Sequence, residues 1–334
     1  MSDTLALEFY GRSARVTSDW PEVIEALRLD FSWFEVESAR AADIDVTIER
    51  RPPDFAVLGD VPAAFVTPRN VVFQQGGRTL VDWQGRALTV LDRRSGSALV
   101  QGEDEQLVHE AVYLGLLSRV GEHLDEHGLT RLHALGLAGE QGGVAVMLPS
   151  GGGKTTLALD ALRDERVKLL SEDTPLLDRH GVLHPFPLRL GVNEGDLAML
   201  SDVPSRRIER IEFQPKLTLG VRPLSHRFER APQPLRHLVV GRRRLGSAAE
   251  LTPLGRRSAV GPLLREAVVG VGVYQGMEFV LQRGMRDVAR KAGVAGARSA
   301  HCAAALRGAT VWRLDLGRDR ERNWQALRPL LGPG

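Results

Sequence analysis

The stretch that decides the fold is residues 144–156, VAVMLPSGGGKTT. Its first part, VAVML, is a short apolar run typical of a buried strand. Three glycines, a lysine and two threonines follow, and the next segment, LALDALRDE, has the pattern of a helix. This order of strand, glycine loop, Lys-Thr pair and helix indicates a phosphate-binding loop.

Each part of the predicted loop has a chemical reason. The glycines let backbone N–H groups approach phosphate oxygens closely, and the start of the helix adds partial positive charge. Lys154 is placed to reach the β- and γ-phosphates of a nucleotide, and the Thr155 hydroxyl to ligate Mg²⁺. The candidate nucleotide-binding residues are Ser150, Gly151, Gly152, Gly153, Lys154, Thr155 and Thr156.

The match has one departure. Leu148 stands where the pattern G-x-x-x-x-G-K-[ST] has its first glycine. The alternative interpretation is a glycine-rich turn with a structural lysine. We favour the phosphate loop because strand, loop, Lys-Thr pair and helix all follow in order.

Composition places the chain among globular proteins. It has 334 residues, of which 43% are hydrophobic, enough for a large core. The single cysteine, Cys302, excludes a disulfide framework and fits a reducing compartment. We see no signal peptide, and the apolar stretches are far short of the roughly 20 residues that cross a bilayer. We therefore expect a cytoplasmic protein without a membrane partner.

The net charge of +2 hides an asymmetry along the chain. Residues 1–200 carry 19 Lys and Arg against 31 Asp and Glu, whereas residues 201–334 carry 25 against 11. A basic final third suits an anionic substrate, and equally suits a solvated Arg-rich surface. The basic residues are scattered, without a helix-turn-helix pattern or aromatic stacking motif, so we expect no nucleic-acid partner.

The pattern of apolar and polar residues along the chain predicts an α/β fold in two domains. Residues 1–101 show short strands, one short helix and an antiparallel meander, typical of a small N-terminal α/β module. Residues 103–128 form a long amphipathic pattern with an acidic first turn, which predicts a helix leading into the second domain. That domain, residues 102–334, would hold the phosphate loop in a mixed-sheet core and end in a basic, largely helical part.

A second element completes the predicted site. Glu172 and Asp173 end the segment VKLLSED, which follows the loop's helix and reads as the next strand. A phosphate loop requires a carboxylate for its metal. A compact unit of loop, helix, strand and acid pair suits enzymes that hand phosphate to a bound acceptor.

Residues 132–192 resemble the catalytic core of HPr kinase/phosphorylase, a family related by fold to phosphoenolpyruvate carboxykinase. That core contains a histidine, two strands, an S-G-x-G-K-S loop, a helix and an Asp-Asp pair. Here His133 precedes the loop serine by 17 positions, the loop reads SGGGKT, and Glu172-Asp173 takes the place of the acid pair. Leu188-Arg189-Leu190-Gly191 loosely resembles the family's later Arg-Gly element.

The chain departs from the family at three points. The first acid is Glu, Pro187 replaces a glutamate before the Arg-Gly element, and the basic tail lacks a counterpart of the region that grips the HPr protein. The segment HPFPLR is more similar to divergent relatives, some of which phosphorylate serine on a peptide. The resemblance thus implies a related kinase with an acceptor other than HPr.

The resemblance also implies a role for each matching residue. Lys154 and the loop amides would hold the phosphates, and Thr155 and Asp173 the Mg²⁺. Glu172 would be the base that accepts the acceptor's hydroxyl proton. His133 would lie beside the acid pair, with a core histidine as the alternative. Arg189, by the family pattern, and Lys216, by the rarity of lysine here, are candidates for binding the acceptor or the transferred phosphate.

The implied function is a Mg-ATP-dependent kinase that transfers the γ-phosphate to a serine-like hydroxyl of a peptide, protein or small molecule. The alternative is a catalytically silent nucleotide-binding partner protein that regulates a biosynthetic enzyme. The sequence leaves open the acceptor, the choice between ATP and GTP, and the oligomeric state, a homo-oligomer included.

Overall fold

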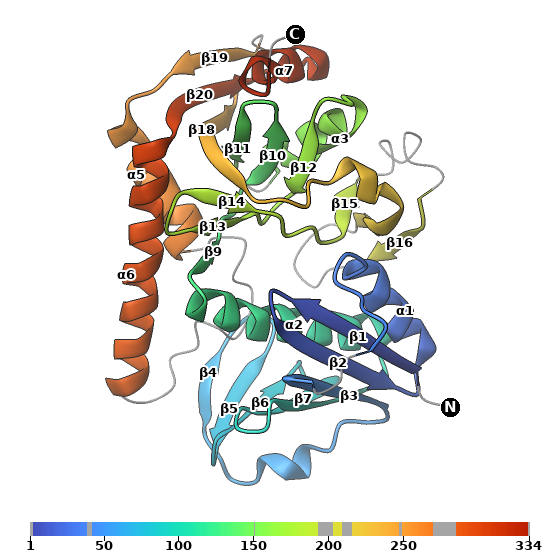
Figure 1. The fold of residues 1–334 in the computed structure, drawn as a ribbon. Helices are drawn as coiled ribbons and strands as arrows, with labels where there is room; N and C mark the ends of the chain where they lie inside the picture. The colour runs from blue at the N-terminus through green and yellow to red at the C-terminus, as the bar shows by residue number, and fades with distance from the viewer. Residues whose placement is uncertain are drawn as a thin grey trace. The chain divides into compact units, whose positions relative to one another are not determined.

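The computed structural model describes residues 3–38, 42–149, 151–192, 203–208, 216–246, 249–269 and 285–332. The chain forms two compact units (Figure 1). The first comprises Met1–His123, Gly191–Val221 and Gly276–Val288, and the second comprises Leu124–Leu190, Arg222–Gln275 and Ala289–Gly334. Both combine helices with mixed sheets, which confirms the predicted α/β class.

The first unit is built on one eight-stranded sheet. Its strands are β1 (Asp3–Phe9), β2 (Arg12–Ser18), β3 (Ile44–Arg50), β4 (Ala63–Val66), β5 (Val71–Gln75), β6 (Arg78–Asp82), β7 (Ala87–Asp92) and β8 (Ser97–Gly102). They lie in the order β1-β2-β3-β8-β7-β6-β5-β4. Strands β4 to β8 pair antiparallel, as the predicted meander requires, whereas β3 runs parallel to both β2 and β8.

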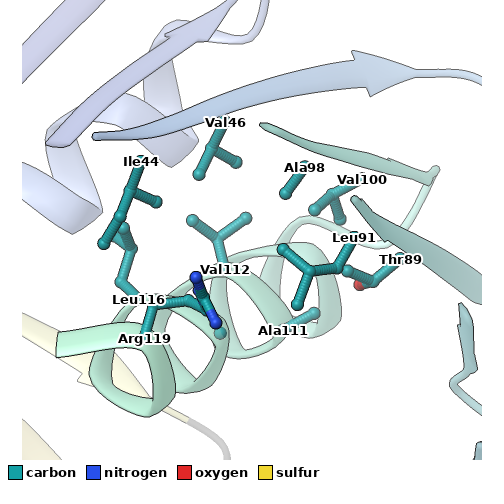
Figure 2. A pocket seen from close by; sticks show the side chains of 11 residues that line it. Ile44, Val46, Thr89, Leu91, Ala98, Val100, Ala111, Val112, Leu116 and Arg119 are labelled. Atoms are coloured by element: carbon teal, nitrogen blue, oxygen red, sulfur yellow. The ribbon is translucent and has the colours of Figure 1, made fainter. Parts of the chain in front are cut away.

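Two helices complete this unit, with a short 3-10 turn at Phe55–Leu58. Helix α1 (Pro21–Asp30) and helix α2 (Glu105–Glu126) are joined by a buried pair, in which His109 Nε2 donates to Asp30 Oδ2 over 2.8 Å. Figure 2 shows side chains of α2 pointing toward those of β3, β7 and β8. The first unit therefore extends past the predicted limit at residue 101, because α2 packs on its sheet.

A separate three-stranded sheet is formed by strands from the region between residues 190 and 219. It has the order β15-β17-β16, with β15 (Leu190–Val192), β16 (Ser205–Ile208) and β17 (Lys216–Leu219). Within the first unit, Arg206 of β16 donates to Glu105 of α2 over 2.6 Å. This segment of the predicted second domain thus folds back onto the first unit.

The second unit contains the nine-stranded sheet that carries the candidate site. Its strands are β9 (Leu129–Arg131), β10 (Leu135–Gly139), β11 (Gly142–Met147), β12 (Lys168–Ser171), β13 (Leu176–Asp178), β14 (Val182–His184), β18 (Gln233–Arg243), β19 (Glu250–Pro253) and β20 (Thr310–Leu316). The order is β12-β10-β11-β18-β14-β13-β9, with β20 pairing with both β18 and β19. Strand β11 lies between β10, to which it is antiparallel, and β18, to which it is parallel.

Helices pack on this sheet around an apolar core. They are α3 (Lys154–Arg163), η2 (Arg222–Arg227), α5 (Arg256–Leu264), the π-helix η3 (Arg265–Val269), α6 (Met285–Gly308), α7 (Arg320–Leu327) and η5 (Arg328–Leu330). Cys302 of α6 is part of the core, and burial raises the pKa of its thiol to about 12. Among the described helices, none combines the length and the apolar character that a membrane span requires.

The packing of α2 in the first unit generates a stability prediction. Gly115 lines a small apolar cavity of about 20 Å³ between α2 and the sheet, and a Cβ built on it would meet no atom within 4 Å. Glycine inside a helix costs about 1 kcal/mol relative to alanine. Gly115→Ala should therefore stabilise the first unit by about 1 kcal/mol, measured as a higher midpoint of urea unfolding.

Gly96→Ala is the matched control, because its expected change in stability has the opposite sign. Gly96 has φ +74°, and its Cβ would lie 2.2 Å from Asp43 O, so this variant should be destabilised. A loss of stability in Gly115→Ala would contradict the open packing of α2.

Candidate active site

The glycine loop follows β11 and leads directly into α3, in the predicted order. Gly151 and Gly153 have φ values of +73° and +113°, which side chains rarely adopt. A Cβ on Gly152 would lie 2.7 Å from Pro149 O. The loop thus depends on glycine. Ser150 lies outside the described residues.

Lys154, the first residue of α3, is buried with its ammonium among three acceptors. Its Nζ lies 2.8 Å from Leu148 O, 2.8 Å from His133 Nε2 and 3.3 Å from Asp173 Oδ1. These partners match the three protons of the ammonium group. The structure therefore brings together the loop lysine, the predicted histidine and one residue of the acid pair.

His133 lies between two carboxylates. Its Nδ1 donates to Glu266 Oε2 over 2.7 Å, and its Nε2 lies 3.3 Å from Asp173 Oδ1. Burial alone would lower the pKa of His133, but the hydrogen bonds with Asp173 and Glu266 outweigh it and raise this pKa to about 9. The ammonium of Lys154 opposes protonation, because a proton on Nε2 would occupy the lone pair that Lys154 contacts.

Glu266 is a site residue that sequence reasoning missed. It belongs to the π-helix η3, its side chain is 3% exposed, and its backbone carbonyl also accepts from the His133 amide. Burial acts to raise the pKa of Glu266, but hydrogen bonds from His133 and Arg265 lower it below its usual value. The signal in the sequence was a lone acid within the mostly apolar run PLLREAVVGV.

The two residues of the acid pair have different partners. Thr155 Oγ1 donates to Glu172 Oε1 over 2.5 Å, whereas Asp173 contacts His133 and Lys154. Partial loss of hydration acts to raise the pKa of Asp173, whose side chain is 42% exposed, but its hydrogen bond with His133 and the charge of Lys154 lower it. Thr155 was predicted to share a metal with Asp173, and in the structure its hydroxyl instead bonds Glu172.

The remaining predicted residues lie as follows. Thr156 is in the first turn of α3, next to Thr155. Arg189 is half-buried in the segment between β14 and β15. Lys216 opens β17 of the first unit, and its side chain lies outside the described part of the structure. The acceptor-binding roles of Arg189 and Lys216 therefore stay predictions.

The site offers oxygen donors for a hard cation. The described residues contain no cluster of three or more His, Cys, Asp and Glu side chains arranged to hold a metal. Mg²⁺, however, needs few protein ligands, because it is usually held by one or two carboxylates together with substrate phosphates and water. The adjacent oxygens of Thr155 and Glu172 fit this mode of binding.

Comparison with known proteins adds no assignment. No protein-family model matches this chain, and no curated protein is significantly similar to it. The functional interpretation therefore depends on the residues of the site and on their geometry.

The contact between Glu266 and His133 generates a prediction. Glu266→Gln keeps a hydrogen-bond acceptor near Nδ1 but removes the negative charge, so the pKa of His133 should fall from about 9 toward its ordinary value. The measurement is an NMR titration of the histidine ring protons, with the His133 resonance assigned from a His133→Gln spectrum.

Glu321→Gln provides the control, because it removes the same charge from an exposed position on α7. The pKa of His133 should be unaffected in that variant. An equal pKa in Glu266→Gln and the parent protein would show that Glu266 does not govern the charge of His133.

Proposed function

We propose that the chain is a Mg-ATP-dependent kinase that transfers the γ-phosphate to a serine-like hydroxyl of a peptide, protein or small molecule. One observation carries the proposal. The buried ammonium of Lys154, at the start of α3, lies beside the glycine loop and within 3.3 Å of both a histidine and a carboxylate. The site thus combines a phosphate-binding cation with a carboxylate able to accept a proton.

Binding of the nucleotide follows from the loop. The backbone N–H groups of the glycine loop and the first turn of α3 would hold the β-phosphate, since the helix start has no side-chain cap. Lys154 would exchange its contacts with Leu148 O and His133 for phosphate oxygens. This exchange is favourable because phosphate carries more negative charge than either of those two partners.

The metal would be held on the side of Thr155 and Glu172, whose oxygens are adjacent. Mg²⁺, when bound, neutralises charge on the β- and γ-phosphates. This assignment is the reverse of the one implied by the family resemblance, which gave the metal to Asp173 and the base to Glu172. We propose the reversal because Thr155 bonds Glu172.

Asp173 would then be the base that accepts the proton of the acceptor hydroxyl. Its side chain is 42% exposed, so an acceptor hydroxyl can approach it, while His133 and Lys154 hold it in place. The acceptor O–H proton passes to the Asp173 carboxylate, the acceptor oxygen bonds the γ-phosphorus, and the bond from that phosphorus to the β-γ bridging oxygen breaks to release ADP. The lowered pKa of Asp173 keeps this carboxylate ionised at neutral pH.

A nucleotide-binding partner protein without transfer activity is the second candidate. The replacement of the family's first Asp by Glu172 and the weak Arg-Gly element favour it. Incubation with γ-labelled ATP separates the two candidates, because label on a serine peptide or released as phosphate requires catalysis. Tight Mg-ATP binding with no label transferred to any acceptor or to water would establish the partner protein.

Lys154 is the first residue to test. Lys154→Ala should weaken Mg-ATP binding by about 100-fold, since a buried charge contact to phosphate has no substitute in the loop. Isothermal titration calorimetry measures this loss, and circular dichroism checks that the variant is folded. Lys168→Ala, at an exposed position on β12, is the control and should bind like the parent protein. Unchanged affinity in Lys154→Ala would rule out the phosphate loop.

The acid pair is tested by a comparison of two isosteric variants. Glu172→Gln should raise the Mg²⁺ concentration needed for half-maximal phosphate transfer, to peptide or to water, because it weakens a metal ligand. Asp173→Asn should leave that concentration unchanged and lower the rate at saturating Mg²⁺ by about 100-fold or more.

The opposite pattern would restore the assignment implied by the resemblance, with Asp173 on the metal and Glu172 as the base. Equal rates and equal Mg²⁺ dependence in both variants would remove the acid pair from the reaction.

A further inference from the structure

Three consecutive arginines lie where β18 ends: Arg242 and Arg243 are its last two residues, and Arg244 follows the strand. This strand lies directly beside β11, runs parallel to it, and therefore ends on the same edge of the sheet as the glycine loop. Side chains alternate between the two faces of a strand. Arg242 and Arg243 thus lie on opposite faces of β18, and Arg244 follows the end of the strand.

Arg242 and Arg244 both pair with a buried carboxylate. Arg242 forms two hydrogen bonds with Asp315, and Arg244 Nη2 lies 3.4 Å from Asp315 Oδ2. Asp315 is 3% exposed and needs such partners, since a buried charge without them is costly. These two arginines therefore have a structural role.

Arg243 does not pair with this carboxylate. It is exposed and, within the described residues, forms no hydrogen bond or ion pair. In the strand register it lies opposite Leu316 of β20. A methyl group built on Gly153 would lie 3.9 Å from Arg243 Nη1 and 3.6 Å from Leu316 Cδ1. An unpaired guanidinium therefore approaches the loop at the residue just before Lys154.

The order of the strands shows from which side Arg243 approaches. Strands β10 and β12 lie on one side of β11, and the residues next to their ends supply His133, Glu172 and Asp173. Strand β18 lies on the opposite side of β11 and supplies Arg243. The loop is thus flanked by the carboxylates on one side and, on the other, by an arginine that is unpaired among the described residues.

From this arrangement we infer that Arg243 binds the α- and β-phosphates of the nucleotide, the part that remains on the ADP product. The inference rests on the proposed function, in which the carboxylate side holds the metal and the γ-phosphate. A planar guanidinium with several N–H donors suits two phosphate oxygens at once. Arg243 is thus a nucleotide-binding residue that does not discriminate between substrate and product.

The test measures the affinities of Mg-ATP and Mg-ADP for Arg243→Gln. Both should weaken by the same factor, about tenfold, the loss expected for charge-assisted hydrogen bonds. Arg243→Lys should recover part of both affinities, because it restores the charge without the planar fork. Arg244→Gln is the control: it removes the same charge one residue along, from a side chain that lies beside Asp315, and should leave both affinities unchanged.

Three results would overturn the inference. Weaker ATP binding with unchanged ADP binding would move Arg243 to the γ-phosphate. Unchanged binding of both nucleotides would show that Arg243 does not contact the nucleotide. Equal losses of affinity in Arg244→Gln would show that the effect of Arg243→Gln comes from the loss of positive charge in general and not from a specific contact. Each of these leaves the proposed function intact if Lys154→Ala still weakens Mg-ATP binding by about 100-fold, whereas a parent protein that binds neither nucleotide would overturn both.

Discussion

The burial of one ammonium group is the constraint on which the second unit's site depends. Removing a charge from water costs several kcal/mol unless partners replace the lost hydration. Lys154 meets this requirement with acceptors from three places: the end of β11, the residue pair before β10 and the exit of β12. The lysine therefore ties the glycine loop to its neighbouring strands. The same charge is what a phosphate group would require at that position.

The local course of the backbone then gives neighbouring residues different partners. Glu172 and Asp173 are adjacent in sequence, yet one bonds Thr155 and the other lies with His133 and Lys154. The three arginines at the end of β18 are divided in the same way: the outer two contact Asp315, whereas Arg243 approaches Gly153. Identical or similar side chains thus acquire different roles because the backbone directs successive residues toward different neighbours.

Much of the second unit was predictable because its signals are local. The apolar run before the loop, the glycines and the helix after them require only neighbouring residues, and the structure has them as β11, loop and α3. The acid pair was predicted from its place after the next strand. Glu266 was not predicted, since it lies 133 residues beyond His133 and reaches it only through the π-helix. The unit limits were also missed in part, because α2 and the segment Gly191–Val221 belong with the first unit.

The sequence by itself determined the α/β class, the glycine loop and the set of chemical groups near it, because these follow from periodicity and from residue types at short spacing. Tertiary structure alone decided which acid pairs with which partner, which arginine approaches the glycine loop, and that a distant glutamate holds the histidine. The physical reason is that a site's electrostatics depend on distances of about 3 Å between groups from separate strands. Such distances are set by strand order and register, which no local pattern contains.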